Sequence, residues 1–220
     1  MLEVITHPDS FFKRKMNEEI EIKIPLMIMG FMWLAGLLKV ILVMFTFRDI
    51  MSAELLPMFI TVVGIALLGS FIGIFAVWII ISGIFYVVSS IFRGKGSFKR
   101  VMEFFSYGFI PSTIEDFVIT VYIVYIMLNM DFVNITQNFS EAEFVAVFLK
   151  LIIFSNPTIT ILLTVFSLIM TFSNLYIWIY GLKYSRNLSL KNAIIAVIVP
   201  VVLYTIYGWV SWIIYFIEMS

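Results

Sequence analysis

Long apolar runs and short polar segments alternate along this chain of 220 residues. Five of the runs approach or exceed the roughly 20 residues that a helix needs to cross a bilayer. They cover residues 26–45, 57–92, 113–128, 158–182 and 193–216. The apolar residues are continuous within each run, whereas the strands of a membrane barrel alternate apolar and polar positions. The pattern therefore predicts an all-α integral membrane protein with a five-span helical bundle.

The second run is unusually long, at 36 residues, which is about 54 Å as a helix. Halving it would leave two pieces too short to span, so we predict one tilted helix that extends past the membrane. Gly69 and Gly73 form a small-xxx-small pair within it. The pair indicates close helix packing within the chain, with a face for a second copy as the alternative. In the last span, we expect Pro200 to kink the helix and Gly208 to lie on a packing face.

Composition supports a membrane protein with no separate soluble domain. Charged residues make up 13% of the chain, against about a quarter in soluble proteins. Cysteine is absent, which excludes disulfides, and with one histidine a metal site would have to rest on carboxylates. We expect no metal, no other cofactor and no nucleic-acid partner. Residues 1–24 are too polar for a signal peptide. We expect them to form a basic, amphipathic tail, followed by a single transmembrane domain over 25–217.

Lysine and arginine are divided unequally between the two sides that five spans define. Of the 14 cations, 11 lie in the tail, after the second span or before the last span. Only Arg48 and Lys150 lie on the other side, and Lys39 lies within the first span. The positive-inside bias then predicts a cytoplasmic amino terminus and an outer carboxyl terminus. In a prokaryotic cell this membrane would be the plasma membrane.

The segment "IFRGKGSFKR", Ile91 to Arg100, is then a cytoplasmic loop, and topology explains much of its charge. Ser97 can cap a short helix with Phe98, Val101, Met102, Phe105 and Phe109 on one face and Lys99, Arg100, Glu103 and Ser106 on the other. Such a helix would lie in the inner interface, and the tail repeats the pattern with Phe11 and Phe12 beside three cations. We therefore expect seven residues to bind anionic lipid headgroups: Lys13, Arg14, Lys15, Arg93, Lys95, Lys99 and Arg100.

Two further serine and glutamate pairs have the spacing of a capping box. Ser112 with Glu115 predicts that a new helix begins just after Pro111. Ser140 with Glu143 predicts a short helix at the outer interface. Asn134 and Asn138 in the same outer segment stand in glycosylation triplets, which are common by chance.

Three stretches of the chain are distinctive when taken together: "HPDSFF" before "KIPL", "GKGSFKR" leading to "YGFIP", and "LKYSRNLSLKNA" before the last span. They resemble the Yip family, membrane proteins named for interaction with Rab-type GTPases. The resemblance implies a five-helix domain with a cytoplasmic amino terminus, and a link in eukaryotic members to vesicle traffic and membrane shaping. Those members have a longer, acidic cytosolic region. The short tail here is more similar to prokaryotic members and argues against a GTPase partner.

The chain also contains a weak internal similarity. "SFKRV" follows the second span and "SLKNA" follows the fourth, which aligns Ser97 with Ser189 and Lys99 with Lys191. Parallel duplication of a two-helix unit would explain it, and so would chance.

Polar side chains within the spans are candidate functional residues. We expect Lys39 to extend to the outer interface and Glu115 to serve as a cap. Asp116 is then a candidate partner for a basic loop residue or a cationic headgroup. A polar stripe follows one face of the fourth span, at Thr160, Thr164, Ser167, Thr171 and Asn174. It indicates helix packing through hydrogen bonds or, alternatively, a polar conduit.

No catalytic motif can be assembled, so we expect a protein that is not an enzyme. The basic cytoplasmic face favours membrane organisation or shaping, or docking of a membrane-protein partner or a second copy. The alternative is a lipid or small-molecule transporter that uses the polar stripe.

Overall fold

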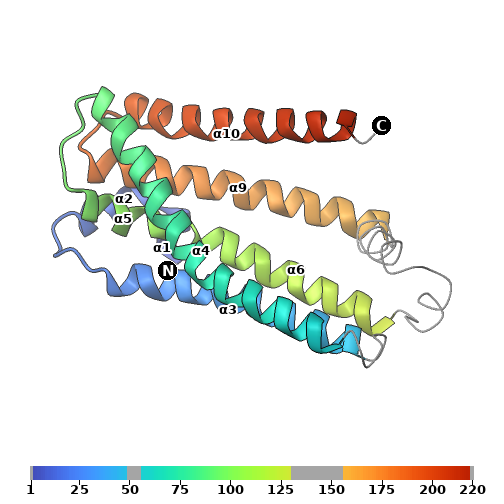
Figure 1. Ribbon diagram of the computed structural model, residues 1–220. Coiled ribbons are helices and arrows are strands. Elements are labelled where there is room, and N and C mark those ends of the chain that lie inside the picture. Colours follow the sequence, from blue (N-terminus) through green and yellow to red (C-terminus); the bar gives the residue numbers. More distant parts are fainter. Residues whose placement is uncertain (1, 49–55, 130–155, 219–220) are drawn as a thin grey trace. The chain divides into compact units, whose positions relative to one another are not determined.

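The computed structural model describes residues 2–48, 56–129 and 156–218, which form helices joined by turns and short loops, with no strand among them (Figure 1). The helices are α1 (Leu2–Thr6), α2 (Pro8–Lys15), α3 (Lys23–Arg48), α4 (Leu56–Ile91), α5 (Phe98–Tyr107), α6 (Ile110–Asn129), α9 (Pro157–Ser185) and α10 (Leu190–Glu218).

Five stretches of the described helices are long and apolar enough to cross a membrane. They lie in α3, α4, α9 and α10, and in α5 taken together with α6. The predicted spans agree with α3, α4, α6, α9 and α10, with small differences at their ends. The predicted all-α fold with five membrane-spanning helices is confirmed.

Helix α4 runs for 36 residues without interruption, as the sequence predicts. The close internal contact that we predicted at Gly69 and Gly73 is absent, because a Cβ built at either residue meets no atom of the described chain within 4 Å. The pair therefore has no close neighbour within the described residues, and a face for a second copy stays a prediction.

The chain divides into two compact units. Unit 1 comprises Met1–Ile28, Ala76–Phe109 and Ser173–Ser220, and unit 2 comprises Met29–Phe75 and Ile110–Phe172. Helices α4 and α9 each contribute one part to each unit, so the division does not follow contiguous segments of sequence. The single transmembrane domain over 25–217 stays a prediction.

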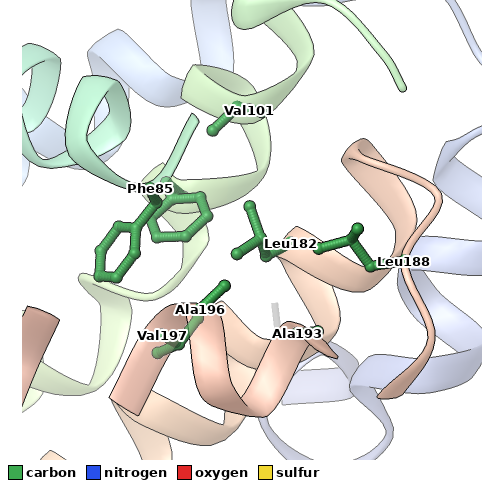
Figure 2. Packing of buried hydrophobic residues seen from close by; sticks show 8 residues of the cluster. Phe85, Val101, Leu182, Leu188, Ala193, Ala196 and Val197 are labelled. Carbon is green, nitrogen blue, oxygen red and sulfur yellow. The ribbon is translucent and has the colours of Figure 1, made fainter. Parts of the chain in front are cut away.

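The core of unit 1 joins segments from four helices (Figure 2). Phe85 of α4 packs against Phe105 of α5, with ring centroids 4.6 Å apart. The other buried members come from α5, α9, α10 and the loop between the last two: Val101, Leu182, Leu188, Ala193, Ala196 and Val197. The small alanines allow α10 to approach closely, because a larger side chain at either position would need space that its neighbours fill.

Two serines begin helices in unit 1. The Ser97 hydroxyl accepts a hydrogen bond from the Arg100 N–H at 3.3 Å, which confirms the predicted cap of α5. Ser189 accepts from the Asn192 N–H in the same way at the start of α10. Each side chain satisfies one of the amides that the first helical turn leaves without a backbone acceptor.

The helices before these serines also end alike. Arg93 after α4 and Asn187 after α9 both have positive φ, 57° and 50°. Gly94 N–H donates to the Ser89 carbonyl, and Leu188 N–H donates to the Lys183 carbonyl. Each of these bonds closes a turn of six residues. Both ends are Schellman motifs. The two connections are thus built on one plan, as a duplicated two-helix unit requires, although duplication itself stays a prediction.

The capping box at Ser112 and Glu115 is wrong. Helix α6 begins at Ile110, so Ser112 lies within its first turn and Glu115 lies further inside. Proline at the second position does not delay the start, because the amide that it lacks would have no acceptor in the first turn. Helix α10 continues through Pro200 to Glu218. The kink at Pro200 and the packing role of Gly208 stay predictions.

Candidate functional site

The amino-terminal tail packs onto unit 1 as part of its folded structure. Phe12 of α2 is fully buried, with its ring 4.8 Å from Phe104 and 6.0 Å from Tyr107, both on α5. A Cβ at Gly181 of α9 would lie 3.6 Å from Phe12 Cζ, an ordinary van der Waals distance, so α9 also lies close to the ring. Burial of a side chain of this size stabilises by about 1.5–3 kcal/mol. We predicted that Phe12 lies at the inner membrane interface, and its burial inside the protein corrects this prediction.

A polar contact also holds α2 against α9. Lys183 Nζ of α9 donates to Asp9 Oδ1 at 2.5 Å, and the Tyr184 hydroxyl donates to the same oxygen at 2.9 Å. The bond from Lys183, supported by that from Tyr184, holds the pKa of the Asp9 carboxyl below its ordinary value. Lys183 therefore holds the tail as an ion-pair partner.

Beneath the tail lies a buried ion-pair network. Glu103 of α5 is fully buried, and its carboxylate accepts from Arg100 Nη1 at 2.7 Å. Arg100 Nη2 donates to the Glu18 carbonyl at 2.5 Å. Lys15 is 8% exposed and pairs with the Glu18 carboxylate at 2.7 Å, 3.9 Å from Glu103. Each charge is compensated inside the protein, as burial of a charge requires.

This network corrects the interpretation of α5 as an interfacial helix with a solvated polar face. Arg100, Glu103 and Ser106, which we placed on that face, are all buried. The physical reason is the tail, whose residues supply the acceptors and the charges that the face needs. Lys15 and Arg100 thus have partners within the chain, and headgroup binding by them stays a prediction without structural support.

A third cluster ties together the two connections of unit 1. Arg186, at the end of α9, is 3% exposed. Its Nε donates to Ser89 Oγ at 2.8 Å, and its Nη2 donates to the Gly94 carbonyl at 2.7 Å. Its guanidinium carbon lies 4.1 Å from the centroid of the Tyr86 ring. The basic segment 93–97 is therefore folded around this side chain.

Six exposed cations of unit 1 take part in none of these contacts: Lys13, Lys23, Arg93, Lys95, Lys99 and Lys191. None of them forms an ion pair within the residues that the structure describes. Arg14 is exposed too, but a double hydrogen bond joins it to Glu3. We call the six residues the basic surface.

In unit 2, Lys39 of α3 pairs with Asp116 of α6 at 2.7 Å. The two side chains are 28% and 32% exposed. The pair explains why each charge is stable here. Lys39 does not need to reach the outer interface, and Asp116 does not need a loop cation or a headgroup. Both interpretations are corrected, because within a membrane an opposite charge on a neighbouring helix is the favourable partner.

The chain matches the model of the Yip1 domain over residues 2–212. It belongs to the Yip1-domain family. An uncharacterized protein of Methanocaldococcus jannaschii is 34% identical over 131 residues, covering 58% of this chain and 89% of the archaeal protein. No solved structure matches. The family and the similarity to a prokaryotic member confirm the resemblance read from the sequence and identify an integral membrane protein.

The polar stripe of this Yip1-family chain is partly satisfied within α9 itself. The Thr164 hydroxyl donates to the Thr160 carbonyl at 2.8 Å, and the Thr160 hydroxyl donates to the Asn156 carbonyl at 3.2 Å. A threonine bonded to its own helix can face lipid. These two threonine hydroxyls therefore do not need a partner on another helix or in water. Packing and conduit both stay predictions for Ser167, Thr171 and Asn174.

Several functional contacts could not be found from the sequence. Asp9 and Lys183 are 174 residues apart, and Arg186 and Ser89 are 97 apart. The sequence shows Arg186 only as one of the cations that predict which side of the membrane each loop faces. The predictions at Asn134, Asn138, Ser140, Glu143 and Lys150 lie outside the described residues.

Proposed function

We propose that this Yip1-family protein is a non-enzymatic membrane protein whose basic surface binds anionic lipid headgroups and so organises the leaflet next to it. One observation carries the proposal. The cations of unit 1 divide into those with acidic or internal partners and the six exposed ones that have no acidic partner in the described chain. Unpaired cations next to an anionic leaflet contribute about 1 kcal/mol each, so the basic surface is the part of unit 1 best suited to that role.

The leaflet that we assign is the cytoplasmic one, since the surplus of lysine and arginine favours that side. Catalysis is not part of the proposal. The acidic side chains Asp9, Glu18 and Glu103 are each paired with a cation, which leaves them poorly placed to act as general bases. The hydroxyls of α9 bonded to their own helix do not favour transport along the stripe.

Retention of lipid tests the proposal. Lys13→Gln, Lys95→Gln and Lys99→Gln, combined in one variant, remove three positive charges without touching the buried clusters. Native mass spectrometry with added phosphatidylglycerol should show its affinity reduced roughly hundredfold, from about 1 kcal/mol per cation. The binding should also weaken with salt.

The matched control is Arg48→Gln with Lys150→Gln, two cations that the sequence predicts on the opposite side. This variant should retain phosphatidylglycerol like the wild type. Equal retention by the triple variant and the wild type would leave the basic surface with no part in lipid binding and would overturn the proposal.

A further inference from the structure

The segment Arg93 to Ser97 contains two glycines at close approaches to the end of α4 and to the end of α9. A Cβ at Gly94 would lie 2.9 Å from the Ser89 carbonyl oxygen and 3.1 Å from Arg186 Nε. Gly96 has a φ of 137°, and a Cβ there would lie 2.1 Å from the Ser185 carbonyl oxygen. A larger residue would therefore displace the segment, at Gly94 from Ser89 and Arg186 and at Gly96 from the end of α9.

The Arg186 side chain donates four hydrogen bonds, two to this segment and two to serines at the end of α4. Besides the bonds from Nε and Nη2 to Ser89 and Gly94, Nη1 donates to the Gly96 carbonyl at 2.5 Å and Nη2 donates to Ser90 Oγ at 3.1 Å. In return, the Arg186 carbonyl accepts from the Lys95 N–H at 2.7 Å. Bonds from a charged donor are stronger than neutral ones, and the planar guanidinium can direct them to several acceptors at once.

The hydroxyls that receive Arg186 are themselves oriented. Ser89 and Ser90 donate to the Tyr86 carbonyl at 2.7 and 3.0 Å, which leaves their oxygens to accept from the guanidinium. The positive charge has no carboxylate partner among the described residues. It is stabilised instead by carbonyl oxygens, by the last turn of α4 and by the face of the Tyr86 ring. Such an arrangement is specific to arginine, because lysine offers one nitrogen only.

We infer that Arg186 is a positioning residue for headgroup binding: it fixes segment 93–97 so that Lys95 and, through the Ser97 cap of α5, Lys99 are presented on the basic surface. This inference rests on the proposed function. Lys95 lies between the two glycines whose carbonyls Arg186 binds, and its own amide is bonded to Arg186. Lys99 follows two residues after the cap that the segment places.

Arg186→Lys tests the inference, because it keeps the charge and removes the planar set of donors. Two readouts are taken on the full-length protein in detergent: hydrogen exchange of the peptide covering 93–97 without lipid, and retention of phosphatidylglycerol by native mass spectrometry. We expect exchange at least about tenfold faster, as loss of charged hydrogen bonds predicts. We expect retention to fall toward that of Lys95→Gln with Lys99→Gln.

Leu188→Ala is the matched control, since Leu188 is a core residue two positions from Arg186 that donates no side-chain bond to the segment. It should lower the unfolding temperature but leave exchange at 93–97 and lipid retention as in the wild type. If Arg186→Lys does not fold, Gly96→Ala tests the same segment by steric displacement from Ser185, with the same two results expected.

The outcomes separate the inference from the proposed function. Unchanged exchange at 93–97 in Arg186→Lys would overturn the inference. Faster exchange with full lipid retention, while the double lysine variant loses lipid, would overturn it too and leave the proposed function standing. A loss of lipid in Leu188→Ala equal to that in Arg186→Lys would show a general effect of instability. Full retention by the double lysine variant would overturn both.

Discussion

Gly108 lies directly against the indole of Trp178. The indole Nε1 donates to the Phe105 carbonyl at 3.0 Å, and the ring stacks on Phe105 with an angle of 14° between the planes. A tryptophan near the end of a membrane span is typical of an interface anchor. Its contacts instead place it within unit 1, where it joins α9 to the end of α5.

Gly108→Ala tests this contact. A Cβ at residue 108 would lie 2.0 Å from Trp178 Nε1, so the indole has to move and lose its bond to Phe105. The φ of Gly108 is −68°, which alanine adopts without strain, so the effect is steric. We expect a loss of about 1–3 kcal/mol in stability from overpacking, measured by thermal unfolding in detergent followed by tryptophan fluorescence.

The matched control is Gly83→Ala in α4, where a Cβ meets no described atom within 4 Å. Alanine should stabilise that helix by about 0.5–1 kcal/mol because it restricts the unfolded chain. Equal unfolding temperatures for the two variants would contradict the account of Gly108.

At the scale of elements, the tail and helix α5 depend on each other. Helix α5 has an amphipathic sequence, and amphipathicity alone cannot distinguish a helix at a membrane interface from one whose polar face meets another polar segment. The tail supplies that segment, through Lys15 and the carbonyls of Lys15 and Glu18. Three of the seven cations that we assigned to headgroups, Arg14, Lys15 and Arg100, are therefore engaged in ion pairs within unit 1.

Docking of the tail should depend on pH through Asp9. Its pKa in the folded protein lies below the ordinary value. The contact with Lys183 therefore stabilises the docked tail above the ordinary aspartate pKa, and this stabilisation is lost as the pH falls through the lower, folded-state value. The ratio of pepsin cleavage after Phe12 in Asp9→Asn to that in the wild type should be well above one near pH 5 and approach one near about pH 2.

Glu3 and Glu18 also have lowered pKa values, because of hydrogen bonds from Arg14 and Lys15. Cleavage of both proteins should therefore rise as the pH falls, and the ratio isolates the part that belongs to Asp9. A ratio of one at every pH would show that the contact between Asp9 and Lys183 does not hold the tail.

For the whole molecule, the sequence predicts those features that depend on residues close together in the chain. The apolar runs predicted the five spans, and Ser97 with the amphipathic pattern after it predicted the start of α5. Contacts between distant residues were not predicted, because nothing local to Phe12, Lys39 or Arg186 specifies the partner. The same limit explains Asp116, for which the sequence indicated an unusual acid but could not name Lys39.

Orientation is the claim on which the proposed role of the basic surface depends, since we assign its anionic headgroups to the cytoplasmic leaflet. The chain has no cysteine, so single cysteines can report on it. Lys95→Cys and Lys191→Cys replace exposed residues of the basic surface, whereas Gln137→Cys lies in the segment that the sequence predicts outside. With a membrane-impermeant thiol reagent added to intact cells, we predict labelling of Gln137→Cys and protection of the other two until the cells are opened. Labelling of Lys95→Cys and Lys191→Cys in intact cells, with protection of Gln137→Cys, would contradict the account.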